Sequence, residues 1–191
     1  MVKKNRNQYI ALYKPYGYTS HFSGQDKHQT LTEFNLPEDV YAAGRLDKDS
    51  EGLLVLTNDG DLIHRLQSPE VAHEKTYWAQ VERIPDEQAL RFLRNGVVLK
   101  GRKTKPCKAR ILDPQPKVAE RNPPIRYREN VQEIWLEIKL TEGKNRQVRR
   151  ITAKVGHPTL RLIRVSVGKL KLWDLNLKPG EWKEVKKSDI V

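Results

Sequence analysis

The sequence predicts an α+β fold, with a mixed, mostly antiparallel central sheet and flanking helices. Two observations predict it. Residues 132–140 alternate apolar and polar side chains, the period of an antiparallel strand with one buried face. Further strand-like segments recur along the chain, separated by turn residues and by a few helical patterns. This order of elements favours one sheet with helices packed against it.

Three strands are expected in the first third of the chain. Residues 9–13 are aromatic and aliphatic and stop at a turn containing Pro15 and Gly17. Residues 40–43 form a short strand that precedes Gly44. Residues 53–57 are a continuous apolar run, which is typical of a strand buried on both faces.

Two helices are expected from their start and stop signals. Asp59 or Asp61 can cap a helix that ends before Pro69. Asp86 can cap a second helix, and Gly96 ends it.

The remainder of the chain predicts more strands and one more helix. Residues 75–81 are rich in strand-forming side chains. The proline-rich stretch 114–124 is expected to be an exposed loop within a hairpin. Residues 143–145 introduce a helix, residues 160–170 form a last long strand, and a short tail follows residue 180.

The composition indicates a polyanionic partner. Lysine and arginine total 36 against 24 acidic residues, which gives a net charge of +12 and a pI near 9.8. Such an excess attracts phosphate backbones. Charge alone does not separate RNA from DNA, or an enzyme from a passive binding protein.

The ends of the chain and its cysteine usage predict where it works. Residues 1–8 are expected to be a flexible basic arm followed by one domain at 9–191, and no apolar segment resembles a secretory signal or a membrane span. Cys107 is the single cysteine, which excludes an internal disulfide and fits a reducing cytosol. We therefore expect a cytoplasmic monomer with no membrane association and no obligate protein partner.

The segment 44–52 carries three alternating carboxylates, on Asp47, Asp49 and Glu51. Oxygen ligands at this spacing resemble the start of a calcium loop. That loop requires a glutamate at its twelfth position, where this chain has Asn58, and it requires flanking helices in place of the predicted strand. The calcium interpretation is therefore disfavoured.

Two interpretations of the acidic segment remain open from the residues alone. It can be a surface turn, or one of its acids can serve as a nucleophile or general base that a nearby guanidinium, such as Arg45, keeps ionised. A loop between two strands, bounded by glycine, is a common place for functional groups. Spacing does not choose among the three acids.

A second candidate site is the cationic stretch at residues 142–150. Its four cations are Lys144, Arg146, Arg149 and Arg150, at the start of a predicted helix, where they can bind phosphate. Arg149 lies beside the apolar stripe of this helix and is the best candidate for an internal ion pair. Solvated basic residues are the simpler alternative.

Aromatic residues near the first turn and in the strand at 75–81 could stack on unpaired bases, although core packing is the commoner role of such rings. They are Tyr13, Tyr16, Tyr18 and Tyr77. The histidines show no metal-binding spacing, and with one cysteine no zinc site is expected. No nucleotide-binding glycine motif is present.

Four motifs occur in the order seen in one family. They are Lys14-Pro15-Tyr16-Gly17-Tyr18, the block from Gly44 to Gly60 that contains Gly44-Arg45-Leu46-Asp47, the triplet Lys75-Thr76-Tyr77, and the stretch from Glu142 to Arg150. Together they resemble the RsuA/RluE-type bacterial ribosomal RNA pseudouridine synthases over residues 9–180. The short chain, with no S4 RNA-binding domain ahead of the match, resembles the RluE branch most.

The resemblance implies roles for single residues. Asp47 matches the family's essential aspartate, and Arg45 matches the residue that fills the gap left by the extruded base. Tyr77 matches the ring that packs on the target uracil, and Arg149 matches the basic residue that ion-pairs with the aspartate. Asp49 and Glu51 receive no catalytic role. The resemblance and the charge together predict an RNA-binding set of Arg45, Lys14, Lys75, Lys144, Asn145, Arg146 and Arg150.

The implied fold is the pseudouridine synthase fold, and the implied reaction converts one uridine of ribosomal RNA, favoured to be 23S RNA of the large subunit, to pseudouridine. The reaction conserves atoms, so neither a cofactor nor a metal is implied, and the uridine must be flipped out of its stem. The first step, attack by Asp47 on C1′, attack on C6 or removal of a C2′ proton, stays open. Two rival hypotheses are a non-catalytic RNA-binding protein and a glycosidase with paired carboxylates.

Overall fold

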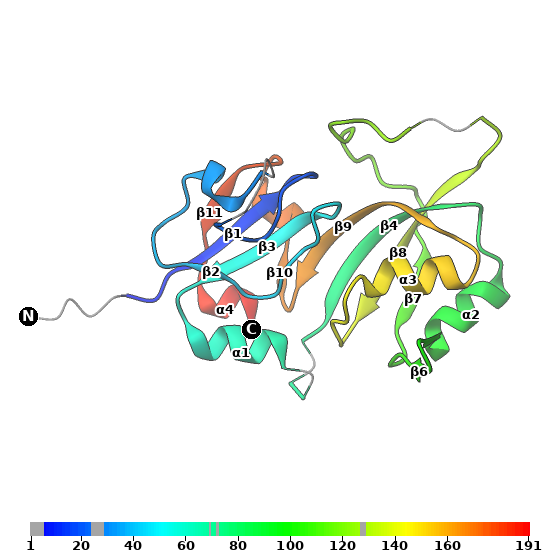
Figure 1. Ribbon diagram of the computed structural model, residues 1–191, viewed down its shortest axis with the longest axis horizontal. Helices are drawn as coiled ribbons and strands as arrows, with labels where there is room; N and C mark the ends of the chain where they lie inside the picture. The colour runs from blue at the N-terminus through cyan, green and yellow to red at the C-terminus, as the bar shows by residue number, and fades with distance from the viewer. Residues whose placement is uncertain (1–5, 24–28, 69, 72, 127–128) are drawn as a thin grey trace, which may run out of the picture.

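The computed structural model describes residues 6–23, 29–68, 70–71, 73–126 and 129–191. Figure 1 shows a strongly twisted sheet that runs the length of the molecule. Helices cover both of its faces: Leu62 and Leu66 pack in one core cluster and Val148 and Ile151 in another, and the two clusters take alternate side chains of the same strands. Among the described residues, no helix is both long and apolar enough to cross a bilayer.

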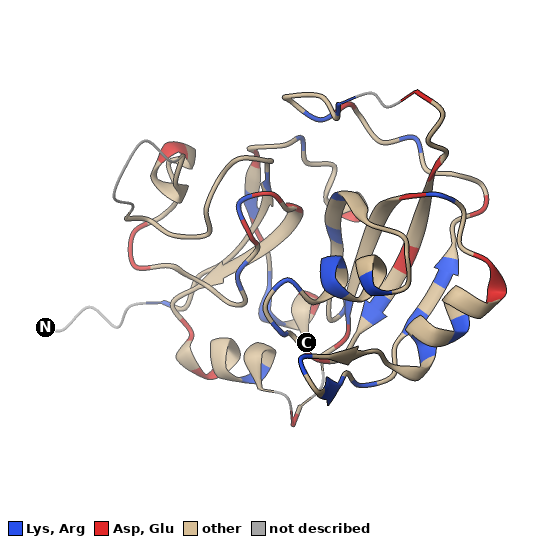
Figure 2. Ribbon diagram, turned by 45° about the vertical axis from the view of Figure 1, so that its right-hand side comes forward, with Lys and Arg blue, Asp and Glu red and all other residues tan. Residues whose placement is uncertain are grey.

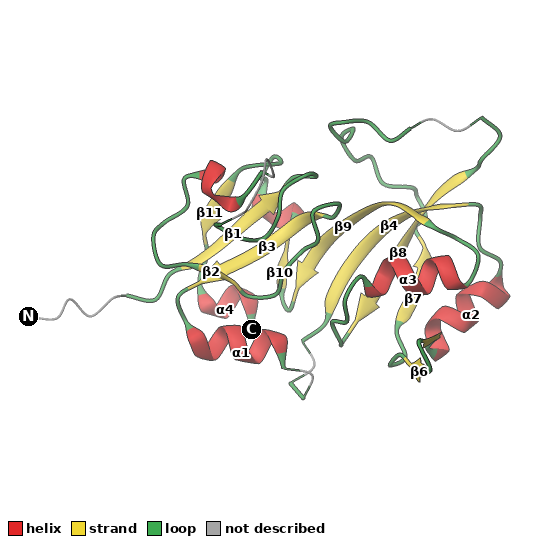
Figure 3. Ribbon diagram, viewed as in Figure 1, coloured by secondary structure: helices red, strands yellow, loops and turns green. Residues whose placement is uncertain are grey.

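One sheet carries the fold, in the strand order β11-β1-β3-β9-β4-β8-β7 (Figure 3). Its neighbouring strands on this path pair antiparallel, except for the parallel pair of β3 and β9. The predicted α+β class with a mixed, mostly antiparallel sheet is therefore confirmed. The bounds are β1 Tyr9–Lys14, β3 Glu51–Thr57, β4 Lys75–Glu82, β7 Lys108–Ile111, β8 Glu133–Leu140, β9 Thr159–Val167 and β11 Trp182–Glu184.

The strand β3 is buried along its whole length, as its continuous apolar sequence predicts. It lies between β1 and β9, and the short strand β2 (Tyr41–Ala42) also pairs with it. In the parallel pair, Gly52 lies opposite Arg164. This pairing fixes the end of the acidic segment against a strand that begins more than a hundred residues later in the sequence.

The helices begin at the predicted caps. In α1 (Gly60–Gln67), the side chain of Asp59 accepts a hydrogen bond from the Leu62 amide at 3.1 Å. In α2 (Glu87–Asn95), Asp86 accepts one from the Ala89 amide at 2.7 Å. Asp59, and not Asp61, is therefore the cap of α1, because its carboxylate satisfies a free N–H of the first turn.

Helix α3 (Gln147–Lys154) lies over the half of the sheet that contains β4 and β8, while α1 lies beside the half that contains β1 and β3 (Figure 1). Val148 and Ile151 of α3 are buried in a core cluster with residues of β4, β8 and α2. A second cluster surrounds β3 and β9, and a third lies on the other face of β1 and β3. Tyr77 packs against two of these clusters.

The C-terminal region differs from its predicted form. The last long strand, predicted at 160–170, stops at Val167, and β10 (Leu170–Lys171) folds back to pair with it. A hydrogen bond from the Gly168 amide to the Glu74 carbonyl stabilises the turn between the two strands. The tail after residue 180 is an edge strand, β11, which pairs with β1, followed by α4 (Lys187–Ile190).

The short elements were not predicted. These are the hairpin of β5 (Val98–Leu99) and β6 (Arg102–Lys103), and two 3-10 helices, η1 (Leu31–Phe34) and η2 (Trp173–Leu175). The proline-rich stretch lies where expected, in the connection of the β7–β8 hairpin.

The predicted N-terminal arm is described only in part. Residues 1–5 lie outside the described residues. At the other end of the arm, the amide of Gln8 donates to Asn58 at 2.7 Å, which fixes its last residue beside the end of β3.

Candidate active site

A cleft of about 400 Å³ opens where the segment before β3, the strands β4 and β9 and the start of α3 converge. Its volume falls within the range of small-molecule sites, about 300–1,000 Å³. Its lining comes from four parts of the chain: residues 44–47 with Ser50, residues 66–68 with Lys75 and Tyr77, residues 140–148, and Leu162 with Arg164. Three of the four sequence motifs therefore meet in one cavity.

Asp47 sits in a tight turn that is braced from outside. The Ser50 amide donates to the Asp47 carbonyl at 3.0 Å, and the Gly17 amide donates to the Lys48 carbonyl at 2.8 Å. Before the turn, the Ser20 hydroxyl exchanges hydrogen bonds with both backbone groups of Leu46, at 2.8 and 3.0 Å. Gly17 of the first motif and Ser20 therefore anchor the acidic segment, while the Asp47 side chain is 36% exposed and lines the cleft.

The three alternating acids differ in their contacts with arginines. Glu51 is buried and accepts two hydrogen bonds from Arg161, both at 2.8 Å. Asp49 accepts two from Arg146, at 2.8 and 2.7 Å. Asp47 lies 3.8 Å from Nη1 of Arg146, with no bidentate contact to a described arginine.

The predicted ion pair between Arg149 and Asp47 is not formed. Arg149 is partly buried, as expected, with a side chain 13% exposed, but its Nε lies 3.3 Å from the Asp49 carboxylate. Its remaining nitrogens donate to the carbonyls of Asp49, at 2.6 Å, and Thr159, at 3.0 Å. Those two carbonyls turn the guanidinium fork away from Asp47, so Arg146 is the arginine nearest to Asp47 among the described pairs.

These contacts perturb the pKa values of the cluster. Burial opposes ionisation of Asp49, but hydrogen bonds from Arg146 and the charge of Arg149 outweigh it and lower the pKa of Asp49. Hydrogen bonding to Asp49 raises the pKa of Arg146. Burial lowers the pKa of Arg149, against the attraction of Asp49. Asp49 is therefore held as a carboxylate that stabilises both guanidinium charges.

Arg164 supports the acidic segment by donating hydrogen bonds to its backbone carbonyls. The sequence did not predict this role. Its side chain is buried, and it donates to the carbonyls of Leu53 at 2.8 Å and of Gly44 at 3.0 Å. A third nitrogen reaches the Arg45 carbonyl at 3.5 Å. An arginine within the apolar run of β9 was the available signal, because a buried charge requires buried partners.

Lys14 is not available to RNA, contrary to the prediction. Its side chain is fully buried, and Nζ donates to the carbonyls of Pro15 at 3.0 Å and Tyr18 at 2.6 Å. Burial is the main cause that lowers the pKa of Lys14 to about 7. This side chain closes the turn of the first motif, because the carbonyls of that turn point inward and need donors.

Lys75 is also largely buried, but it lines the cleft. Its Nζ donates to the Leu66 carbonyl at 3.0 Å. Burial, followed by the charge of Arg164, lowers the pKa of Lys75 to about 8. Tyr77, two residues further along β4, lies half-buried in the same cleft.

The remaining predicted RNA-binding residues lie on the rim of the cleft or beside it. Arg45, Lys144, Asn145 and Arg150 are exposed, and the first three line the cleft. Arg150 donates to the Asn145 side chain at 2.8 Å. Figure 2 shows lysines and arginines on α3 and on the neighbouring loops of this region. The rim therefore presents cations to a polyanion, as the cationic stretch predicted.

Buried Glu142 organises the loop that carries these cations. One of its oxygens accepts from the Lys105 amide at 2.8 Å and from the Gln147 side chain at 2.5 Å. The other lies 3.1 Å from Nζ of Lys144. Glu142 was missed because its partners come from a distant loop and from the first turn of α3.

The described residues contain no group of three or more histidine, cysteine or acidic side chains placed to hold a metal ion. Cys107 donates to the Leu93 carbonyl at 3.1 Å, and burial raises the pKa of its thiol to about 11. The partly buried, protonated thiol is poorly suited to act as a nucleophile.

A half-exposed carboxylate in a cleft rimmed by cations defines a site for a polyanionic substrate. The family model described as RNA pseudouridylate synthase matches residues 8–154. The chain is 56% identical over 165 residues to the ribosomal large subunit pseudouridine synthase E of Xanthomonas axonopodis pv. citri, covering 85% of this chain and 87% of that protein. It is 50% identical over 184 residues to the protein of the same name from Vibrio parahaemolyticus, covering 96% and 76%.

The fold is also similar to a solved structure. A crystal structure of a pseudouridylate synthase aligns with a TM-score of 0.78 and 30% identity, covering 96% of this chain and 72% of that one. The chain therefore belongs to the RNA pseudouridylate synthase family, and it is an enzyme of that class, a pseudouridine synthase.

Proposed function

We propose that this enzyme isomerises one uridine of large-subunit ribosomal RNA to pseudouridine, with Asp47 as the nucleophile. The relatives from Xanthomonas and Vibrio carry names that specify the ribosomal large subunit. The single observation that supports Asp47 is the division among the three acids. Glu51 and Asp49 each use both oxygens on an arginine, whereas Asp47 lies 3.8 Å from its arginine and lines the cleft.

The geometry suits a carboxylate that acts on a flipped-out nucleotide. The reaction breaks the N1–C1′ bond, turns the uracil and rejoins it to C1′ through C5, so a group is needed that holds the separated base. Tyr77 lies in the cleft with Asp47 and offers a ring for stacking. Arg45, two residues before Asp47, fills the vacancy left in the RNA stem in this proposal, and its exposure on the cleft lining supports that role. Extrusion costs a few kcal/mol, and these contacts offset part of that cost.

The proposal includes the setting of the enzyme. The rim cations Lys144, Arg146 and Arg150, with Arg45 and Asn145, hold the RNA backbone, and Lys75 acts from inside the cleft. Arg149 supports the acidic segment by donating to the backbone carbonyl of Asp49. The catalytic unit spans residues 9–191 as one domain and acts as a monomer in the cytoplasm. The continuous sheet supports a single domain, and the charge of +12 supports binding to RNA.

The test replaces Asp47 with asparagine and with alanine. We expect the wild-type protein to form pseudouridine in large-subunit RNA transcripts, detected as carbodiimide-dependent stops in primer extension. Both variants should form none, because neither side chain offers an ionised carboxylate, and both should still bind RNA. Asp61→Asn, an exposed acid in the first turn of α1, is the matched control and should keep wild-type activity.

Pseudouridine formed by purified Asp47→Ala protein would overturn the assignment of the nucleophile. An inactive wild-type protein that binds RNA would favour the non-catalytic alternative. Free uracil as the product would favour a glycosidase.

A further inference from the structure

The carboxylate of Asp49 accepts hydrogen bonds from both terminal nitrogens of Arg146. The two hydrogen bonds, at 2.8 and 2.7 Å, form the bidentate arrangement that fixes both the position and the plane of a guanidinium. The same carboxylate lies 3.3 Å from Nε of Arg149, and the backbone carbonyl of Asp49 accepts from that arginine at 2.6 Å. One residue therefore holds two arginines that come from the start of α3.

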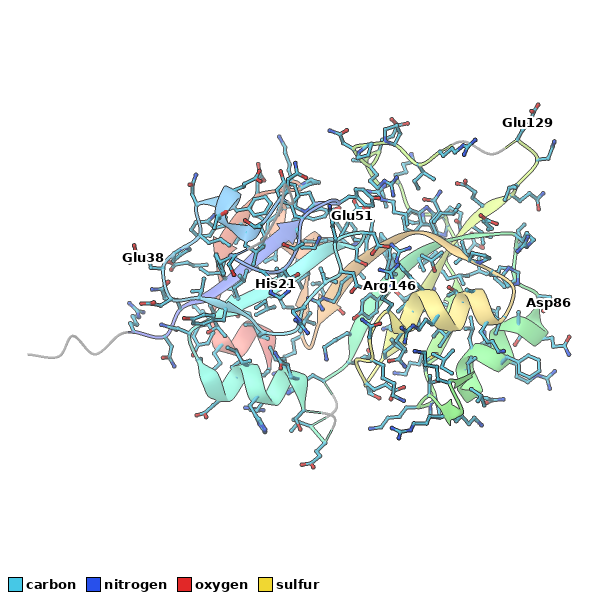
Figure 4. All side chains as sticks on the ribbon, viewed as in Figure 1. His21, Glu38, Glu51, Asp86, Glu129 and Arg146 are labelled. Carbon is cyan, nitrogen blue, oxygen red and sulfur yellow. The ribbon has the colours of Figure 1, made fainter. Side chains whose placement is uncertain are left out.

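Arg146 needs such a partner to stay in place. It is the N-cap of α3 and has a left-handed backbone conformation, with φ 50° and ψ 34°, and its side chain is 41% exposed. A long exposed arginine samples many rotamers, and ordering it costs conformational entropy. In Figure 4, Arg146 is labelled near the middle of the molecule, between α3 and the β3 half of the sheet.

These hydrogen bonds to Asp49 hold the guanidinium of Arg146 beside Asp47. With Asp49 holding it, Nη1 of Arg146 lies 3.8 Å from the Asp47 carboxylate. This distance gives electrostatic stabilisation without the close bidentate pair that would occupy the oxygens of Asp47. Asp49 takes the hydrogen bonds of both terminal nitrogens of Arg146, so the oxygens of Asp47 are left without a hydrogen bond from that arginine.

We propose that Asp49 is a positioning residue, which holds Arg146 at the working distance from Asp47 and thereby sets the rate of the chemical step. This inference rests on the proposed role of Asp47 and deepens it. It assigns Arg146 to the reacting carboxylate as well as to the RNA backbone. It also separates Asp49 from Glu51, whose buried pair with Arg161 belongs to the core.

The test measures kcat and KM separately, by tritium release from RNA that carries [5-³H]uridine. We expect Asp49→Asn to lower kcat by about tenfold or more, which corresponds to the coupling energy usual for contacting residues, and to leave KM within about twofold. Asp49→Glu keeps the charge and should restore part of kcat. In an Arg146→Ala background, Asp49→Asn should cost less than about a further twofold, because the residue through which it acts is gone.

The control is Glu137→Gln, which removes an acid paired with Arg110 at 3.0 Å on β8 and β7, outside the cleft lining. It should leave kcat unchanged. Urea unfolding shows that each variant is folded under assay conditions. If Asp49→Asn fails to fold, the comparison of Asp49→Glu with wild type, alone and with Arg146→Ala, takes its place, because the longer side chain displaces the guanidinium.

Two results would overturn the proposal. One is a raised KM with unchanged kcat, which would make Asp49 a holder of a phosphate-binding arginine only. The other is costs that add independently in the double variant. Neither result is confused with failure of the proposed function, since that failure appears as an inactive wild type or an active Asp47→Ala protein in the same series.

Discussion

Gly52 lies where the acidic segment meets β9, and replacing it by alanine tests how closely the two must approach. A Cβ at this position would lie 2.3 Å from the carbonyl oxygen of Arg164 and 2.7 Å from its amide nitrogen. Both are backbone atoms in the interior of the sheet, so neither can rotate away as a flexible side chain would. Gly52 also has φ +107°, where an L-residue is strained.

Two terms give the magnitude. The left-handed conformation costs an alanine about 1–2 kcal/mol. Overpacking against a fixed neighbour adds about 1–3 kcal/mol, because the parallel pairing of β3 and β9 must part to relieve it. Gly52→Ala should therefore lower the free energy of unfolding by about 2–5 kcal/mol. At about 2–4 °C per kcal/mol for a chain of this size, Tm should fall by about 4–20 °C.

The matched control is Gly101→Ala in the turn of the β5–β6 hairpin. Gly101 also has a positive φ, +76°, but an added Cβ there meets nothing within 4 Å. This variant should show only the backbone term, about 1–2 kcal/mol. Urea unfolding of wild type and both variants, with equal m-values, measures the difference.

Gly52→Ala should also lower the enzymatic activity. Arg164 holds the carbonyls of Gly44 and Leu53, so a shift of its backbone moves the segment that carries Asp47. The Gly52→Ala protein should therefore stop forming pseudouridine at urea concentrations well below its unfolding midpoint. The Gly101→Ala protein should still form it under the same conditions. Equal destabilisation of the two variants would refute the argument from close approach.

Two further predictions concern buried charges. The pKa of Lys14 is lowered from 10.5 to about 7, so between these values the unfolded chain binds more protons than the folded one and stability rises with pH. Relative to a Lys14→Met variant, the free energy of unfolding of wild type should rise by about 2 kcal/mol from pH 7 to pH 9, and a constant difference in urea unfolding would contradict this. Arg161→Met should cost about 3–5 kcal/mol by leaving the buried Glu51 carboxylate unpaired, and Glu51→Met/Arg161→Met should recover most of that loss. A double variant as unstable as Arg161→Met would contradict the second prediction.

Local signals in the sequence were sufficient for the long elements of the fold. Alternation identified β8, the continuous apolar run identified β3, and Asp86 with Gly96 bounded α2. The strands β5, β6 and β10 have two residues each, too short for any period to show. The sequence did not predict the turn at Gly168, because the residues on both sides of it are apolar and strand-forming. The pattern therefore predicted one continuous strand over residues 160–170.

The site was predictable as a set of motifs but not as a set of contacts. The sequence placed Arg146 and Arg149 on the start of a helix and Asp47 in a loop. Which acid each arginine meets depends on the offset between α3 and the acidic segment. That offset is set by the β3–β9 pairing and by two carbonyls that capture Arg149. No pattern of residue types encodes those carbonyls, and the predicted pair of Arg149 with Asp47 failed for this reason.

The alternating acids make three different kinds of contact, which their spacing alone could not assign. Glu51 begins β3 and is buried with Arg161, so neutralising it should act on stability. Asp49 lies in the turn with both oxygens on Arg146, so neutralising it should act on kcat and only while Arg146 is present. Asp47 has its carboxylate in the cleft, so neutralising it should abolish the reaction at unchanged stability and RNA affinity. Three different signatures from three acids within five residues would be hard to reconcile with a simple acidic surface turn.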